Sequence, residues 1–148
     1  MSDVRVAGAE DATVVADLLI AFRDWIGYAT PPDETVRSTV AKLIEDPNTL
    51  YLLAGDVGLA QLRFRLSAWT GVEDCWLEDV FVSDDARGTG LGRALVEAAI
   101  ERARARGCRR IELDVQEDNE HAIRLYEKCG FSVRPKGSGH TLFLSAKL

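Results

Sequence analysis

The stretch that decides the fold is Val80-Phe81-Val82-Ser83-Asp84-Asp85-Ala86-Arg87-Gly88-Thr89-Gly90-Leu91-Gly92-Arg93. It runs from an apolar segment typical of a buried strand, through a turn with three glycines, into a long amphipathic helix. Glycine lets a backbone turn sharply and approach a ligand closely. The first N–H groups of a helix have no internal partner, and the helix dipole makes that end positive. The pattern therefore predicts a phosphate cradle, to which Arg87 and Arg93 could add charge-assisted hydrogen bonds.

The spacing of the glycines narrows the choice of ligand. The spacing Gly88-x-Gly90-x-Gly92 differs from the G-x-G-x-x-G of dinucleotide-binding folds. That pattern also follows the first strand of a βαβ unit, whereas this turn comes after several expected strands. A nucleoside-triphosphate loop would need Gly-Lys-Ser or Gly-Lys-Thr, which this stretch lacks. A tight turn without any ligand is the alternative. We favour a ligand-binding turn over this alternative, because three glycines, two arginines and the start of a helix occur together here.

Hydrophobic periodicity predicts alternating strands and helices on both sides of this turn. The expected order is β-α-α-β-β-β-α-β-α-β-β, an α/β (α+β) single domain over residues 1–148 with a mixed sheet of about seven strands and about four helices. Asp11 is the expected N-cap of the first helix, and Gly107 ends the third. The expected strands are Val4–Ala7, Leu50–Ala54, Val57–Leu66, Cys75–Val82, Arg110–Gln116, Phe131–Arg134 and Thr141–Lys147, and the expected helices are Ala9–Trp25, Asp33–Glu45, Leu91–Arg106 and Asn119–Cys129.

Composition and charge exclude several classes of protein. The formal net charge of −6 argues against nucleic acid as a partner and suits a cationic amine, although plain solubility explains most of it. Apolar runs are too short to cross a membrane, and the first residues do not form a secretion signal. Cys75, Cys108 and Cys129 are odd in number and widely spaced, which argues against disulfides and a zinc site. We therefore expect a cytoplasmic protein without a metal or a membrane contact.

Two motifs together resemble those of the GNAT acetyltransferases. Arg87-Gly88-Thr89-Gly90-Leu91-Gly92 is similar to the family's R/Q-x-x-G-x-G/A signature, which binds the pyrophosphate of acetyl-CoA, and the stretch 119–131 resembles its N-x-x-A-x-x-x-Y-x-x-x-G-F helix. The resemblance covers essentially the whole chain, is strongest over 77–131, and is weak before residue 50. It implies a GNAT-like, mostly antiparallel sheet, acetyl-CoA as co-substrate, and a set of residues that bind it: Val80, Phe81, Val82, Arg87, Gly88, Thr89, Gly90, Leu91, Gly92, Arg93, Asn119 and Tyr126.

Acetyl transfer to an amine needs a base for the ammonium, a donor for the oxyanion, and an acid for the departing thiolate. The resemblance implies that Tyr126 is the acid, and a phenol with a pKa of about 10 can protonate a thiolate held beside it. Simple packing beside Ala122 and Ile123 is the alternative. The resemblance also implies that the backbone of Val80 and Val82 pairs with the pantetheine arm, with the Val80 N–H as oxyanion donor.

Glu78 and Asp79 are the candidates for the base because they interrupt an apolar strand, where a carboxylate is costly to bury. Neighbouring strand residues face opposite sides, so at most one of them points into a given site. The stretch 77–82 resembles the polyamine (diamine) acetyltransferase branch, whose glutamate at this position favours Glu78. The alternative is that the carboxylate forms a salt bridge or lies at a solvated strand edge. For Asp79 we prefer this alternative to the role of base. A water chain to a more distant base is also open.

The remaining candidates concern the acceptor and the surface. Three aromatic residues stand at predicted loop edges and could line an acceptor pocket: Trp25, Tyr28 and Trp69. Core packing is the alternative for them. The expected substrate-binding set is Trp25, Tyr28, Glu78 and Asp79. Asn119 is expected to contact CoA, to cap its helix, or to do both. His121 and His140 are expected on the surface.

The sequence therefore predicts an acetyl-CoA-dependent N-acetyltransferase that acts on a primary amine of a small cationic molecule, such as a polyamine or an aminoglycoside. Two alternatives stay open. One is an enzyme for protein or peptide amines, and the other is a non-catalytic acyl-CoA-binding module on the same fold. The resemblance also implies a possible homodimer.

Overall fold

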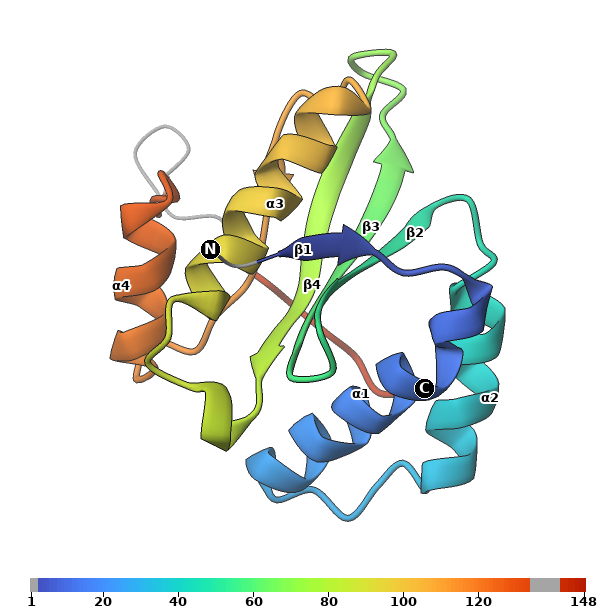
Figure 1. Cartoon of the computed structure of the whole chain (residues 1–148). Coiled ribbons are helices and arrows are strands. Elements are labelled where there is room, and N and C mark those ends of the chain that lie inside the picture. Colours follow the sequence, from blue (N-terminus) through green and yellow to red (C-terminus); the bar gives the residue numbers. More distant parts are fainter. Residues whose placement is uncertain (1–2, 134–141) are drawn as a thin grey trace.

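The computed structural model describes residues 3–133 and 142–148 of the 148-residue chain. A single five-stranded sheet forms its centre, with the strands in the order β1-β2-β3-β4-β5 (Figure 1). Neighbouring strands are antiparallel, except that β5 runs parallel to β4. The sheet is therefore mixed and mostly antiparallel, as expected. Its strands are β1 (Val4–Val6), β2 (Thr49–Ala54), β3 (Gly58–Leu66), β4 (Glu73–Val82) and β5 (Ile111–Glu112).

Four helices cover the two faces of this sheet. On one face, α1 and α2 enclose a core with Val15, Val40 and Phe81 at its centre. On the other face, α3 buries Leu95 and Val96 against the sheet, and α4 adds partly buried side chains to the same core. The bounds are α1 (Ala12–Ile26), α2 (Asp33–Leu43), α3 (Leu91–Ala105) and α4 (Glu120–Lys128), with short 3₁₀ turns η1 (Ala9–Asp11) and η2 (Asp84–Ala86).

The predicted order of elements is confirmed from β1 to α4. Asp11 does stand directly before α1, but its carboxylate makes no capping bond to that helix. It accepts hydrogen bonds from the Gly8 N–H and the Arg5 guanidinium instead. Hydrogen bonding by Arg5, ahead of the Gly8 N–H, holds the pKa of Asp11 at about 2. Asp11 thus joins the start of α1 to β1.

The prediction of about seven strands is wrong for the described residues, which form five. Residues 131–133 and 142–147, expected in the last two strands, adopt no strand, and Arg134, His140 and Thr141 lie outside the described residues. The strand expected over 110–116 shortens to the two residues of β5. Its alternating pattern was compatible with a longer strand, but pairing to β4 stops at Trp76 and Glu112. A strand needs a hydrogen-bonded neighbour as well as the right pattern.

Candidate active site

A β-bulge in β4 sets the geometry of the site. Leu62 lies opposite Leu77, and Gln61 lies opposite Asp79, so Glu78 is an extra residue without a partner on β3. A bulge of one residue moves the following side chains to the other face of a sheet and bends the strand. Accordingly Leu77 packs on the α3 side, whereas Asp79 lies on the α1–α2 side.

Beyond the bulge, β4 has an open edge. It pairs with β5 only at Cys75 and Trp76, so within the described residues the segment 77–82 is hydrogen-bonded to β3 alone. The Ser83 N–H donates to the Val57 carbonyl at 2.8 Å on the β3 side. Because backbone groups alternate along a strand, those of Val80 and Val82 point toward the open edge. This edge can take up one extended chain as an additional strand.

The glycine turn follows this edge and leads into α3. Gly88 and Gly90 have positive φ angles of 75° and 85°, which a residue with a Cβ rarely adopts, and Gly90 stands at the N-cap of α3. Nothing lies within 4 Å of the place where a Cβ would sit at either glycine. The first turn of α3 carries no acidic residue, so no carboxylate of this turn competes with an anion for its free N–H groups. At Gly92, a Cβ would lie 3.4 Å from Leu125 of α4, an ordinary van der Waals contact, so the packing of α3 against α4 does not require a glycine here.

The two arginines of the turn are engaged by the protein itself. Arg87 donates from Nε to the Val82 carbonyl at 3.0 Å, and its guanidinium lies 4.3 Å from the centre of the Trp25 ring. Arg93 pairs with Glu97 at 2.8 Å on the exposed side of α3. Arg87 thus ties the turn to β4 and α1. A contact from either arginine or from the Thr89 hydroxyl to a phosphate stays a prediction.

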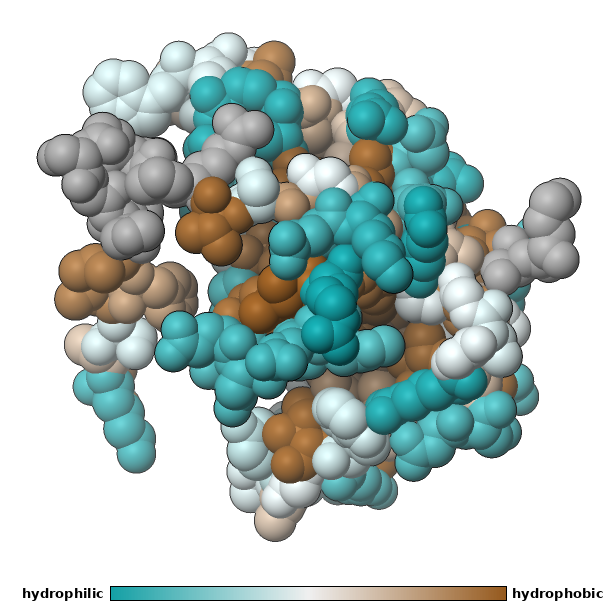
Figure 2. Space-filling view, turned by 90° about the vertical axis from the view of Figure 1, so that its left-hand side faces the viewer, coloured by the Kyte–Doolittle hydropathy of each residue, from teal (hydrophilic) through white to brown (hydrophobic). Residues whose placement is uncertain are grey.

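Helix α4 brings Tyr126 to the same side of the sheet as α3. Asn119 caps the helix, since its Oδ1 accepts a hydrogen bond from the Ala122 N–H at 3.2 Å, which confirms the capping role. The Tyr126 ring packs edge-on against Phe131 with ring centres 5.7 Å apart. Burial, and after it the charges of Asp79 and Asp114, raise the pKa of Tyr126. The phenol therefore keeps its proton at neutral pH. Figure 2 shows the side of the molecule that carries α4, where hydrophilic side chains surround recessed apolar surface.

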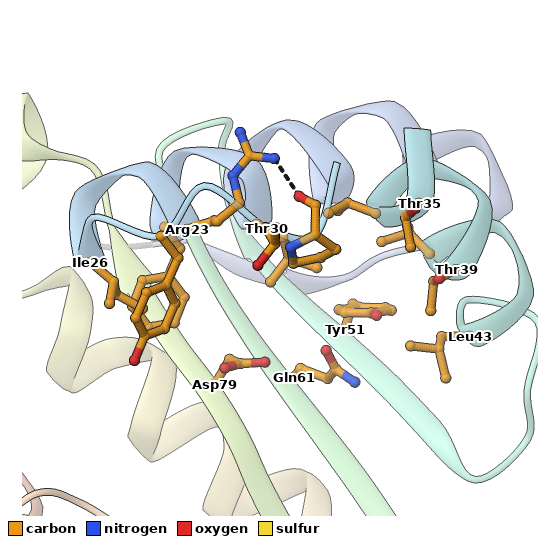
Figure 3. A pocket seen from close by; sticks show the side chains of 15 residues that line it. Arg23, Ile26, Thr30, Thr35, Thr39, Leu43, Tyr51, Gln61 and Asp79 are labelled. Carbon is orange, nitrogen blue, oxygen red and sulfur yellow. Dashed lines mark hydrogen bonds between the residues drawn. The ribbon is translucent and has the colours of Figure 1, made fainter. Parts of the chain in front are cut away.

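A pocket of about 300 Å³ lies between the α1–α2 pair and the sheet (Figure 3). Its walls are mainly apolar side chains of the two helices, and its floor carries three polar side chains, those of Tyr51, Gln61 and Asp79. Burial, and after it the charge of Glu78, raises the pKa of Asp79 to about 6. Asp79 is thus a carboxyl group that ionises close to neutral pH, at the bottom of a pocket beside the open edge of β4. This is the environment of a general base.

The structure brings together some of the predicted acceptor residues and separates others. Tyr28 lines the pocket, but Trp25 does not; it lies outside, against Phe22 and Arg87. Trp69 is 98% exposed in the turn between β3 and β4 and is no part of the pocket lining. Glu78 is exposed at the bulge, whereas Asp79 is partly buried. His121 is exposed, as expected.

The sequence prediction missed Tyr51 and Gln61. A signal for Gln61 was present, since it is a polar residue inside the apolar run of β3 and is 5% exposed. Nothing in the pattern of β2 separates Tyr51 from an ordinary core residue.

Within residues 3–133 and 142–148, no cluster of His, Cys, Asp or Glu is arranged to hold a metal ion. None of the helices in those ranges is long and apolar enough to cross a membrane.

The family of the chain follows from its similarity to known proteins. Residues 16–131, well over half of the chain, match the acetyltransferase (GNAT) family. The chain belongs to the GNAT acetyltransferase family. A protein from Arthrobacter sp. FB24, whose solved structure is described as that of a "putative acetyltransferase", shares the fold with a TM-score of 0.89 and 32% identity, covering 100% of this chain and 97% of the other. An aminoglycoside acetyltransferase from an uncultured soil metagenomic sample, solved with sisomicin, has a TM-score of 0.78 at 14% identity over 99% and 95% of the two chains, which shows the fold alone.

Curated relatives of this GNAT enzyme are similar over part of their length. A mycothiol acetyltransferase of Beutenbergia cavernae is 40% identical over 90 residues, which are 59% of this chain and 29% of the relative. A thialysine N-epsilon-acetyltransferase of Sus scrofa is 35% identical over 50% of this chain and 43% of its own. A spermine/spermidine N(1)-acetyltransferase of Bacillus subtilis is 42% identical over 38% of each. The chain thus spans less than half the length of these relatives, whose named substrates do not transfer to it directly.

Proposed function

We propose that this GNAT enzyme transfers an acetyl group from acetyl-CoA directly to the primary amine of a small cationic molecule. One observation carries the proposal: the open edge of β4 lies between the glycine turn and the pocket that contains Asp79. A single strand can therefore hold the thioester arm with its backbone and present a carboxylate to the amine. Relatives named for spermine/spermidine and thialysine support an amine as acceptor.

Several features of the chain fit acetyl-CoA. Gly88 and Gly90 keep the space before α3 free of side chains, and the N-terminus of α3 suits a pyrophosphate. The outward-pointing backbone of Val80 and Val82 suits the amide groups of a pantetheine arm. When bound, acetyl-CoA supplies the activated acetyl group. We assign the Val80 N–H as the donor to the oxygen that gains negative charge, because it points toward the open edge of β4. The Asn119 amide caps its helix, and its expected contact with the co-substrate stays a prediction.

Proton transfer is assigned to two side chains. Tyr126 gives its proton to the departing thiolate, because its raised pKa keeps it protonated until that step. Asp79 accepts the proton of the ammonium, because it is partly buried, lies in the pocket and has a pKa of about 6. The sequence pattern favoured Glu78 for this role, and that prediction stays open. Glu78 is exposed, which supports a role in attracting the cationic acceptor and in raising the pKa of Asp79.

The first experiment is thermal unfolding with and without acetyl-CoA, with adenosine and NAD as controls. A ligand that binds only the folded state at about 100 times its dissociation constant adds about 2.7 kcal/mol, so the midpoint should rise with acetyl-CoA alone. Thiol release over a panel of amines then measures turnover. Binding without turnover of any amine would favour an acyl-CoA-binding module, and turnover only with peptides would favour a protein acceptor. The cytoplasmic location and the homodimer stay predictions.

The base assignment has a matched pair of variants. Asp79→Asn and Glu78→Gln each replace one carboxylate by its amide at neighbouring positions of β4. We expect Asp79→Asn to lower kcat by about 100-fold or more, the usual contribution of a general base, and Glu78→Gln to act mainly on KM. The reverse pattern would return the role of base to Glu78.

A further inference from the structure

One wall of the pocket is formed by the last turns of α1 and the loop that follows them. Six residues of this stretch line the pocket: Phe22, Arg23, Ile26, Tyr28, Thr30 and Pro31. In Figure 3, Arg23 and Thr30 lie over the pocket floor that carries Gln61 and Asp79. The position of the end of α1 therefore sets the shape of the pocket around an acceptor.

Arg23 fixes this stretch on the side of its own loop. Its Nη1 lies 2.7 Å from the Asp33 carboxylate and donates to the Pro31 carbonyl at 2.7 Å. The backbone carbonyl of Arg23 accepts hydrogen bonds from the N–H groups of Gly27 and Tyr28, each at 3.1 Å. These bonds join the end of α1 to the loop and to α2, and none of them reaches β4 or the glycine turn.

Arg87 fixes the same stretch from the side of the glycine turn. Its Nε donates to the Val82 carbonyl at 3.0 Å, and its Nη1 lies 3.3 Å from the Asp84 carboxylate. The guanidinium held in this way lies 4.3 Å from the centre of the Trp25 ring, in the last turn of α1, and 5.8 Å from that of Phe81. A cation at such distances is attracted to the aromatic ring. Arginine can donate from the edge of its planar group and stack with its face, which lysine cannot do.

Aromatic stacking connects this contact to the pocket wall. Phe22 stacks on Phe81 with ring centres 5.0 Å apart and an interplanar angle of 20°, and it lies 6.4 Å from Trp25. Phe81 is buried on the α1–α2 side of β4. Phe22, Trp25, Phe81 and Arg87 therefore form one cluster that joins the glycine turn, β4 and the wall of the pocket.

We propose that Arg87 and Trp25 are positioning residues for the acceptor, because their stacking holds the end of α1, and with it the pocket wall, against β4 and the glycine turn. This inference rests on the proposed function, which places the amine in that pocket. Neither residue lines the pocket, so both act through Phe22 and the loop after α1. A residue of the predicted cofactor turn thus also determines how well the acceptor binds. A contact between Arg87 and a phosphate is a separate prediction.

Two substitutions remove the stacking from either side. Arg87→Lys keeps the charge and loses the planar group, and Trp25→Leu removes the ring from an exposed position outside the pocket. A cation–π contact at an exposed site changes an equilibrium constant about two- to fivefold. Each variant should therefore raise the acceptor KM by about that factor and leave kcat within about twofold. Thiol release with spermidine and with 2-phenylethylamine as acceptors measures both constants.

Conservative and combined variants separate positioning from other roles. Trp25→Phe keeps an aromatic ring and should lie closer to the parent than Trp25→Leu. Arg104→Lys, in an exposed pair with Glu101 near the end of α3, is the matched control and should leave the acceptor KM unchanged. The double variant with Arg87→Lys and Trp25→Leu should raise the acceptor KM no further than the larger single change, because both remove one contact. Effects that multiply, or an Arg87→Lys effect confined to the KM of acetyl-CoA, would overturn the inference.

Amide hydrogen exchange tests the positioning without any substrate. The Gly27 and Tyr28 N–H groups report on the end of α1, and the Gly107 N–H, which donates to the Arg104 carbonyl at 2.9 Å, reports on the end of α3. In Arg87→Lys and in Trp25→Leu, exchange at Gly27 and Tyr28 should be about two- to fivefold faster than in the parent, with no change at Gly107. Faster exchange without thiol release from any amine would refute the proposed activity alone. Thiol release with unchanged exchange at Gly27 and Tyr28 would refute the positioning role alone.

Discussion

Asp79→Asn should stabilise the folded protein at neutral and alkaline pH. In the folded chain, burial raises the pKa of Asp79 from its ordinary 3.8 to about 6. At 1.36 kcal/mol per pH unit, this difference means that the ionised carboxylate destabilises the fold by up to about 3 kcal/mol. Asparagine has nearly the same shape and carries no charge. The replacement removes that cost, and such a gain would fit the proposed role of Asp79 as a base that is retained for chemistry rather than for stability.

The pH dependence gives this prediction its sign. Between pH 3.8 and about 6 the folded chain holds a proton on Asp79 that the unfolded chain has lost, so the free energy of unfolding falls as pH rises through this window. The destabilisation is absent below the window and complete above it. The advantage of Asp79→Asn over the parent should therefore grow by about 2 kcal/mol between pH 4.5 and pH 8.

Urea unfolding followed by fluorescence at several pH values, without acetyl-CoA, measures this difference. Asp56→Asn is the matched control for the loss of one negative charge, because Asp56 is exposed in the turn between β2 and β3. Glu78→Gln should show a smaller gain of the same sign, since the charge of Glu78 is the second cause of the raised pKa. A difference between Asp79→Asn and the parent that does not change with pH would refute the burial of an ionisable carboxylate in the pocket.

Four further outcomes follow from the site and its supports. The value of kcat/KM should fall below pH 6 as Asp79 takes up a proton, and a pH–rate profile without that limb would contradict its role as base. Tyr126→Phe should lower kcat about 100-fold with little change in the KM for acetyl-CoA; an unchanged kcat in steady-state assays would exclude it as the acid. Gly90→Ala should cost about 1–2 kcal/mol of backbone strain at φ +85°, whereas Gly92→Ala inside α3 should be neutral or gain up to about 1 kcal/mol, both by urea unfolding; similar losses at the two positions would argue against this geometry. Asp11→Asn should destabilise at neutral pH, and its difference from the parent should shrink as pH falls from 3.8 to about 2, measured by the same method; a constant difference would mean that the Arg5 pairing does not matter.

Local patterns in the sequence predicted the elements that depend on neighbours along the chain. The helical spacing in α1 and α3, the left-handed glycines before α3 and the Asn119 cap of α4 are each determined within a few residues. The same holds for the two motifs that resemble the GNAT family, which the matched range 16–131 confirms. These features required no knowledge of how distant segments meet.

Pairing between strands was not accessible in the same way. The alternation over 110–116 suited a long strand, but a strand forms only where a neighbour runs alongside it. The pairing of β5 with β4 ends at Glu112 and Trp76, and the bulge at Glu78 follows on β4. For the same reason the pattern could not tell Glu78 from Asp79. Both interrupt an apolar run, and simple alternation gives no account of an extra residue.

The sequence by itself therefore determined the family, the order of elements and the place of the glycine turn, because each depends on residues close together in the chain. The tertiary structure decided which carboxylate faces the pocket and what lies beside it. Asp79 meets Gln61 and Tyr51 only through the register of three strands, and one bulged residue sets that register. A shift of one residue moves every later side chain to the opposite face of the sheet, so the position of the carboxylate in the pocket is a property of the folded sheet.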